Sequence, residues 1–271
     1  MRPSITLETK CWEADWRLLL TTDRLRTLAE RNCFDFAERT LMINNVADQE
    51  TVRGYAERGV ASGLLTRYLV VGEHADEAMR FFQVTAETLT EGYKYSIAEL
   101  VSVYLCRTDY LLHFAGDCLP LAAYDWIPRA IACMNANPLI KVANLTWDAK
   151  YAEAEAESAF QTDDFFVGFG FSDQCYLVRT ADFRAPIYND VNEASARYPG
   201  YGGELFEKRV DAWMRNHGFL RATFKHGTYL HEKHDPPAPS RFRLALGRVL
   251  SRVRRVLSFM VPSSRAGASG R

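Results

Sequence analysis

Several common signatures of ligand binding are missing from this 271-residue chain. No G-x-G-x-x-G segment follows the first expected strand, and no G-x-x-x-x-G-K-[ST] segment occurs, so an ordinary dinucleotide or P-loop site is not expected. The six cysteines are scattered and never form a C-x-x-C pair. That spacing argues against a zinc knuckle and fits reduced thiols in the cytosol.

Long apolar segments are also missing. No uninterrupted apolar run is long enough to span a bilayer, and the opening stretch MRPSITLETK has no apolar run of signal-peptide length. We therefore expect a cytoplasmic protein. The length and the 48% hydrophobic content suit one sizeable globular domain, or one domain with appendages.

Acidic residues are absent after Asp235. Eight of the 33 Lys and Arg residues lie in 240–271, which leaves 25 against 34 Asp and Glu in residues 1–239, a net charge of −9. An acidic body argues against nucleic acid as a partner.

Segments with the periodicity of strands and helices alternate in the first half of the chain. This alternation predicts the α/β class, with a mainly parallel central sheet flanked by helices on both faces. Residues 10–13 are expected to form a loop after the first strand. The strands are expected at 5–8, 39–44, 67–71 and 110–114, and the helices at 18–31, 48–62, 75–82 and 97–105.

The second half mixes the two kinds of element less regularly. Its polar, Ala/Glu-rich segment 151–160 is helix-prone and is expected to form a surface helix or a mobile flap. Residues 184–203 contain Pro and Gly and predict a loop. Further helices are expected at 126–134 and 205–213, and strands at 139–145, 175–178, 220–224 and 227–231. Residues 167–171, with two glycines, are expected to form a strand or a tight loop.

Asp117 is the first candidate for a ligand-binding residue. The apolar run 110–114 predicts a buried strand, and Gly116 and Pro120 allow the chain to turn directly after it. Ligands bind at the carboxyl ends of strands in open α/β sheets. A carboxylate there can hold a divalent cation, and the cation can hold a diphosphate. The simpler alternative is an aspartate that only caps the next turn.

Two glutamates lie where the helix at 205–213 is expected to begin. Glu204 or Glu207 would there be placed to accept a proton from a substrate hydroxyl. The alternative is purely structural, because an acidic residue in the first turn stabilises a helix by roughly 0.3–1 kcal/mol.

His231 ends the last expected strand, in the segment GTYLH. A neutral imidazole nitrogen there could serve as a metal ligand. An ordinary surface histidine is the alternative.

The C-terminal segment differs in composition from the rest of the chain. Pro residues in 235–239 predict a rigid linker, and 262–271 is expected to be disordered. On a helical wheel, 240–261 has a long apolar stripe opposite arginines, which is typical of a helix that lies on an anionic membrane surface. The alternative is a helix that docks on the acidic body or on a partner.

The order of elements over residues 4–232 resembles the GT-A glycosyltransferases, most closely family-two-like bacterial enzymes that build surface polysaccharides. The resemblance implies a GT-A-like domain at 1–234. It also implies Mn²⁺ or Mg²⁺ bound by Asp117, the second carboxylate of an Asp-x-Asp motif, and by His231. Ala115 stands where the family has the first Asp.

The resemblance also implies roles for other residues. Asn44, Asn45 and Asp48, with Asp117, would bind a nucleotide-sugar donor, taken as a UDP-sugar. Glu207, preferred to Glu204, would be the catalytic base of an inverting transfer. Ser172, Asp173 and Gln174 would contact a saccharide or lipid-linked acceptor.

These roles describe a hexosyltransferase-type enzyme of cell-surface polysaccharide synthesis, cytoplasmic and peripheral at the inner face of the membrane. The missing first Asp leaves a second hypothesis open, in which a GT-A-like domain has lost catalysis and serves as a binding or scaffold subunit at the membrane. A third option is another α/β transferase such as a methyltransferase, against which the missing Gly-rich loop counts.

Overall fold

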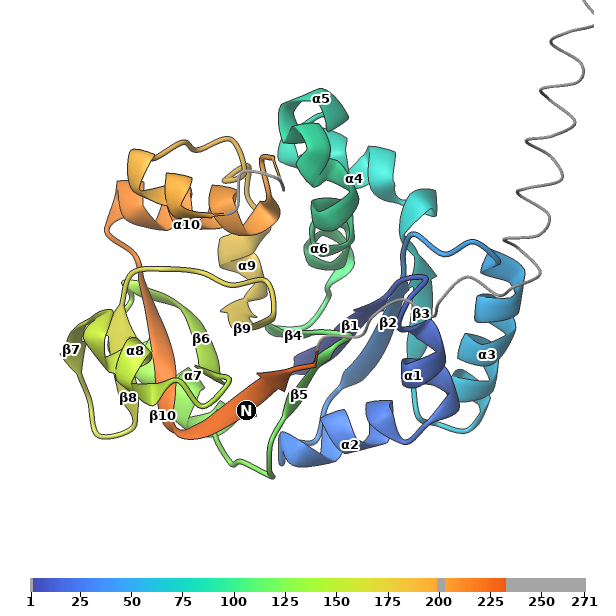
Figure 1. The fold of residues 1–271 in the computed structure, drawn as a ribbon, viewed down its shortest axis with the longest axis horizontal. Coiled ribbons are helices and arrows are strands. Elements are labelled where there is room, and N and C mark those ends of the chain that lie inside the picture. Colours follow the sequence, from blue (N-terminus) through green and yellow to red (C-terminus); the bar gives the residue numbers. More distant parts are fainter. Residues whose placement is uncertain (1, 199–202, 233–271) are drawn as a thin grey trace, which may run out of the picture. The chain divides into compact units, whose positions relative to one another are not determined.

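One ten-stranded sheet organises the residues that the computed structural model describes, 2–198 and 203–232 (Figure 1). The strand order is β3-β2-β1-β4-β9-β6-β10-β8-β7, and β5 pairs with β10 outside this path. The strands are β1 (Ile5–Cys11), β2 (Glu38–Ile43), β3 (Arg67–Val70), β4 (Tyr110–Ala115), β5 (Cys118–Pro120), β6 (Ile140–Trp147), β7 (Ser158–Gln161), β8 (Phe165–Gly168), β9 (Cys175–Arg179) and β10 (Leu220–His231).

The first four strands of the order form a parallel unit. β1 lies between β2 and β4 and is parallel to both, and β3 adds to the outer edge of β2. Each crossover between these strands contains helix, as parallel neighbours require. The predicted α/β class, with a central sheet flanked by helices, is confirmed.

The second half of the sheet mixes strand directions. β9 is antiparallel to β4 and to β6, whereas β6 and β10 are parallel. β5 and β8 are both antiparallel to β10. β10 therefore brings the end of the described chain back beside the loop that follows β4.

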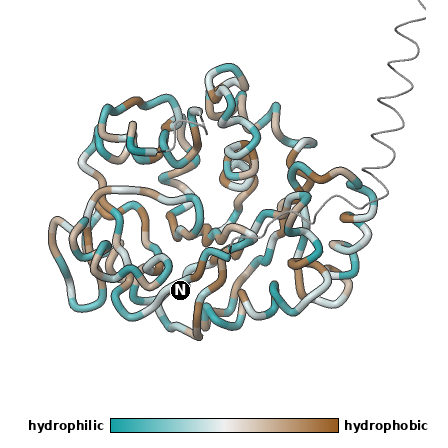
Figure 2. Tube along the Cα trace, in the orientation of Figure 1, coloured by the Kyte–Doolittle hydropathy of each residue, from teal (hydrophilic) through white to brown (hydrophobic). Residues whose placement is uncertain are grey.

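Helices cover both faces of the sheet. In β4, Leu112 and Phe114 belong to a buried cluster with residues of α2 and α7, whereas Leu111 belongs to another with residues of α6 and α10. Figure 2 shows hydrophobic residues along the central strands. The helices are α1 (Trp16–Thr21), α2 (Arg24–Arg31), α3 (Gln49–Ala61), α4 (Ala75–Phe82), α5 (Ala86–Leu89), α6 (Tyr93–Leu105), α7 (Ile127–Ala136), α8 (Tyr151–Ala156), α9 (Thr180–Phe183) and α10 (Phe206–His217), with 3₁₀ turns η1 (Val71–Glu73), η2 (Thr90–Gly92) and η3 (Glu193–Arg197).

Several sequence-based expectations about the elements need correction. Lys10 and Cys11 were expected in a loop but continue β1, because they pair with Ala115 of β4 and Ile43 of β2. The single helix expected over 18–31 is two helices, separated at Thr22. The helix expected over 151–160 ends at Ala156, after which the chain forms β7.

The two short strands expected at 220–224 and 227–231 are a single strand, β10, with a register shift between Phe224 and Thr228. Gly227 lies at this irregularity, where a Cβ atom would come within 2.9 Å of the Tyr124 ring. The predicted linker 235–239, helix 240–261 and tail 262–271 lie outside the described residues. Within the described ranges, no helix combines the length and the apolar character needed to cross a bilayer.

Candidate functional site

Close packing at Gly116 brings the ends of β1 and β4 together. A Cβ atom on Gly116 would come within 2.6 Å of Asp15 Oδ2 and 2.7 Å of the Lys10 carbonyl oxygen. Any larger residue would push the loop after β4 away from the end of β1. Glycine at this position therefore allows Asp117 to lie beside the residues that follow β1.

Asp117 and His231 are in direct contact. His231 Nε2 lies 3.1 Å from Asp117 Oδ2, and the two side chains are 29% and 30% exposed, so a ligand can reach both. The contact follows from the topology, because β10 pairs with β5 and places His231 opposite Cys118, the residue after Asp117. The structure thus brings together the two residues that the sequence analysis assigned to a metal.

Gln174 and Asp148 hold His231 in place. The Gln174 Oε1 atom accepts a hydrogen bond from the Tyr229 hydroxyl at 3.0 Å, which turns Nε2 of the amide toward His231 Nδ1 at 3.3 Å. The Gln174 amide therefore contacts Nδ1 of the ring, and Nε2 is the ring nitrogen that faces Asp117. The backbone N–H of His231 donates to Asp148 Oδ1 at 2.9 Å.

Asp15 is a functional candidate that the sequence analysis missed. It is buried, with 3% of its surface exposed, and accepts a hydrogen bond from the Trp12 backbone N–H at 2.8 Å. Burial raises the pKa of Asp15 to about 7, the Asp117 charge adds to the rise, and the Trp12 N–H and Lys10 oppose it. A signal was present, because Asp15 follows β1 at the sheet edge where Asp117 follows the adjacent parallel strand.

Glu207 lies in the first turn of α10 and is half-buried. Its pKa is raised to about 9, chiefly by burial and then by the Asp173 carboxylate, whereas the Asp173 backbone N–H, Lys10 and Arg197 act to lower it. Glu207 therefore holds a proton at neutral pH. Once it loses this proton it is a stronger base than an ordinary glutamate.

Glu204 has different surroundings. It precedes α10, which begins at Phe206, so its expected place in the first turn is wrong. Its carboxylate lies 2.5 Å from Lys208 Nζ and 3.2 Å from Arg209 Nε. These two cations engage Glu204, so Glu207 is the better placed of the two for proton transfer.

Lys10 connects the two groups of acids. It lies near the end of β1, forms an ion pair with the buried Glu99 of α6, and is close enough to lower the pKa of both Asp15 and Glu207. The acids after β1 and β4 and the acid of α10 therefore belong to one region. Lys10 was expected in a loop, so its sequence position predicted no role for it.

The residues proposed for the acceptor lie between these groups. Gln174 contacts His231, and the neighbouring Asp173 donates its backbone N–H to Glu207. The Ser172 hydroxyl accepts from the Gln174 backbone N–H at 3.3 Å. This segment runs directly into β9 and links the Asp117 side of the region with the α10 side.

The residues proposed for the nucleotide follow β2. Asn44 and Asn45 donate their side-chain amides to the Lys94 carbonyl oxygen, at 3.4 and 2.8 Å. Asp48 caps α3, where it accepts from the Thr51 N–H and hydroxyl, and these bonds lower its pKa. The structural role thus accounts for Asp48. Within the described ranges, no contact joins these three residues to Asp117, and their nucleotide role stays a prediction.

Together these residues define an α/β protein with an acidic site at the carboxyl ends of parallel strands, where such folds bind ligands. Among the residues that the structure describes, no group of three or more His, Cys, Asp or Glu side chains is arranged to hold a metal ion without help from a ligand. Asp117 and His231 supply two donors, and further positions would fall to a ligand or to water.

No family model matches the chain, and no curated protein has a matching sequence. Solved structures do show a likeness. The glucosyl-3-phosphoglycerate synthase of Mycobacterium tuberculosis is 14% identical, with a TM-score of 0.46 over 100% of this chain and 85% of that one. The same enzyme with Mn²⁺, uridine diphosphate and phosphoglyceric acid gives 13% and 0.45, over 98% and 82%. A further mycobacterial protein gives 13% and 0.46, over 99% and 79%. The likeness is distant and concerns the backbone arrangement alone.

Proposed function

We propose that this chain is a GT-A-type glycosyltransferase, which moves a sugar from a nucleotide-sugar donor, taken as a UDP-sugar, to a hydroxyl of a saccharide or lipid-linked acceptor. The contact of 3.1 Å between Asp117 Oδ2 and His231 Nε2, directly after β4, carries this proposal. It joins residues that are far apart in the sequence at the position where the family resemblance implies the donor diphosphate.

Asp117 and His231 are a suitable donor set for Mn²⁺ or Mg²⁺. Such ions are commonly held by one or two carboxylates together with substrate phosphates, so the absence of a first Asp at Ala115 does not prevent binding. Asp15 adds a second carboxylate close to Asp117. A bound cation would stabilise the negative charge that develops on the departing diphosphate.

Glu207 is the proposed base, which takes the proton of the acceptor hydroxyl as the hydroxyl attacks the sugar carbon. It must first lose its own proton, and the nearby charges of Lys10 and Arg197 favour that loss. A base on the side of the sugar opposite to the leaving diphosphate gives an in-line displacement, which inverts the configuration at the sugar carbon. Ser172, Asp173 and Gln174 would contact the acceptor, and Asn44, Asn45 and Asp48 the nucleotide.

A second candidate function is a GT-A-like domain without catalysis that serves as a binding or scaffold subunit at the membrane. It is supported by Ala115 in place of the first Asp and by the two-residue donor set.

Turnover separates the two candidates. A panel of nucleotide sugars is offered with Mn²⁺, and release of the nucleoside diphosphate is measured for the wild type, Asp117→Asn and the exposed control Asp163→Asn. We expect release from at least one donor, a loss of at least about 100-fold in Asp117→Asn, and no change in the control. No release from any donor by a wild type that still binds UDP would favour the scaffold subunit.

The proposed setting is surface-polysaccharide synthesis at the inner face of the membrane. It rests on the apolar stripe of 240–261 and the arginines opposite to it. Deletion of 240–271 should release the protein from anionic vesicles in a sedimentation assay. Unchanged binding of the shortened chain would refute this part of the proposal.

A further inference from the structure

A concave site lies at the end of β4 opposite to Asp117. A groove of about 680 Å³ is lined by residues that precede β1, start β4 and end β9, including Arg2, Arg107, Tyr110 and Arg179. β4 runs from Tyr110 toward Asp117 at about 3.3 Å per residue, so the groove lies roughly 20 Å from the acidic site. Its volume is in the range of small-molecule sites.

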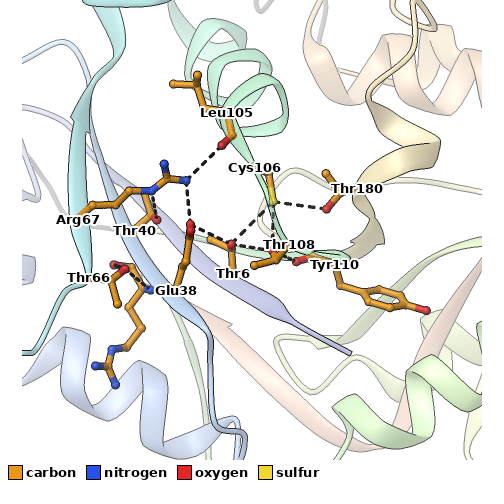
Figure 3. A network of polar contacts seen from close by, with 11 residues as sticks. Thr6, Glu38, Thr40, Thr66, Arg67, Leu105, Cys106, Thr108, Tyr110 and Thr180 are labelled. Carbon is orange, nitrogen blue, oxygen red and sulfur yellow. Dashed lines mark hydrogen bonds and ion pairs between the residues drawn. The ribbon is translucent and has the colours of Figure 1, made fainter. Parts of the chain in front are cut away.

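The floor of the groove is a network of buried polar side chains (Figure 3). Cys106 Sγ lies 3.4 Å from the hydroxyls of both Thr108 and Thr180. The Thr108 hydroxyl lies 2.8 Å from the Thr6 hydroxyl and donates to the Tyr110 carbonyl oxygen at 2.8 Å. These contacts tie the starts of β1 and β4 to the end of β9, so the floor is held by three strands.

The same network holds the connection from α6 to β4, which carries Arg107. Arg67 pairs with Glu38 at 2.9 Å and donates to the Leu105 carbonyl oxygen at 3.2 Å. Glu38 in turn accepts from the Thr6 hydroxyl at 3.4 Å. Figure 3 shows this chain of contacts running from Arg67 to Thr180.

The groove wall is strongly basic. Arg2, Arg107, Arg179 and Arg184 line it, with Asp109 as the single acid of the lining. The Asp109 carboxylate is occupied by the backbone N–H and hydroxyl of Ser4, both at 2.8 Å, and these bonds lower its pKa. This concentration of guanidinium groups contrasts with a net charge of −9 over residues 1–239.

Three of these arginines have no acidic partner in the described chain. Arg184 stacks over the Phe81 ring at 5.4 Å, and Arg2 stacks over the Phe34 ring at 4.2 Å. No carboxylate of the described residues lies within salt-bridge distance of Arg2, Arg107 or Arg184. Arg179 donates to Asn135 at 3.0 Å and is 3.8 Å from Asp182, which also pairs with Lys141. The groove therefore presents guanidinium charge that the protein itself leaves uncompensated.

We propose that this groove binds a phosphate-bearing anion, at a site separate from that of Asp117. Arginine matches phosphate because its planar fork donates two parallel hydrogen bonds and keeps its charge at all physiological pH values. Tyr110 and Pro3 add an apolar wall for the rest of the ligand. The phosphate belongs either to a soluble phosphate ester or to the headgroup of an anionic lipid.

The test uses the full chain and two double variants. Arg107→Gln/Arg184→Gln removes two of the three uncompensated charges, and Arg26→Gln/Arg58→Gln removes two exposed arginines elsewhere, as a matched control. Inorganic pyrophosphate is titrated by calorimetry in EDTA, which excludes binding through a metal at Asp117. We expect binding at least tenfold weaker in Arg107→Gln/Arg184→Gln than in the wild type and the control.

A vesicle arm distinguishes the two sources of phosphate. Sedimentation with phosphatidylglycerol vesicles is compared with phosphatidylcholine vesicles for the same three proteins, all of which keep residues 240–271. Loss of pyrophosphate binding in Arg107→Gln/Arg184→Gln, with unchanged binding to phosphatidylglycerol vesicles, supports a soluble ligand. Loss of phosphatidylglycerol binding in this variant, but not in the control, supports a lipid headgroup. If neither binding depends on Arg107 and Arg184, the proposal is wrong.

Discussion

The two ends of β4 carry opposite charge. Beyond its carboxyl end, Asp117, Asp15 and Glu207 lie in one partly buried region, and burial raises the pKa of the last two. At its amino end, Arg107 and Arg184 are exposed and have no acidic partner in the described chain. The acidic end offers carboxylates and the basic end offers guanidinium groups, so one buried strand separates two regions of opposite charge.

The largest effect at the acidic end is expected from Glu207→Gln. Loss of a positioned base lowers kcat by about 10²–10⁴-fold, whereas the donor KM should change little because Glu207 does not contact Asp117 or His231. Steady-state kinetics with an accepted donor measures both constants. The exposed Glu30→Gln is the control, and a kcat near wild type in Glu207→Gln would remove the base assignment.

A smaller effect is expected from Gln174→Ala. This variant removes the amide that orients the His231 ring, and loss of such a supporting contact typically lowers metal affinity by about 10–100-fold. Mn²⁺ titration in the presence of UDP measures the change. Gln161→Ala, at an exposed glutamine, should match the wild type, and equal affinities for all three proteins would show that Gln174 does not support the site.

The smallest effect concerns stability and pH. The pKa of Glu207 rises from 4.5 in the unfolded chain to about 9 in the native protein. Between these values the native state binds more protons, so this carboxyl makes the protein less stable as pH rises. Glu207→Gln lacks this dependence. As pH rises from 5 to 9, the Tm of the wild type should therefore fall relative to that of Glu207→Gln, by about 2–4 °C for each kcal/mol that the wild type loses in its free energy of unfolding. Parallel Tm curves over this range would contradict the raised pKa.

The sequence was most informative where local pattern and chain geometry agree. The apolar run before Gly116 predicted a buried strand, and the parallel rule placed Asp117 at the sheet edge that binds ligands. His231 was a weaker inference, because its position depends on β10 pairing with β5, a contact between residues more than 100 apart in the sequence. The structure brings both residues together, while their role in metal binding stays a prediction.

Other features depend on packing that no local pattern encodes. Asp15 is buried against Gly116, and Lys10 pairs with Glu99 across 89 residues. The antiparallel strands of the second half were visible as segments, but their partners follow from long-range pairing. The groove around Arg107 collects arginines from three separate parts of the chain, so composition showed only an acidic body.

UDP binding measured with and without Mn²⁺ tests the central claim most directly. Calorimetric titration should give at least tenfold tighter binding with Mn²⁺ for the wild type and for Asp163→Asn, and no such gain for Asp117→Asn. Equal UDP affinity with and without Mn²⁺ in the wild type would contradict a cation site at Asp117 and His231.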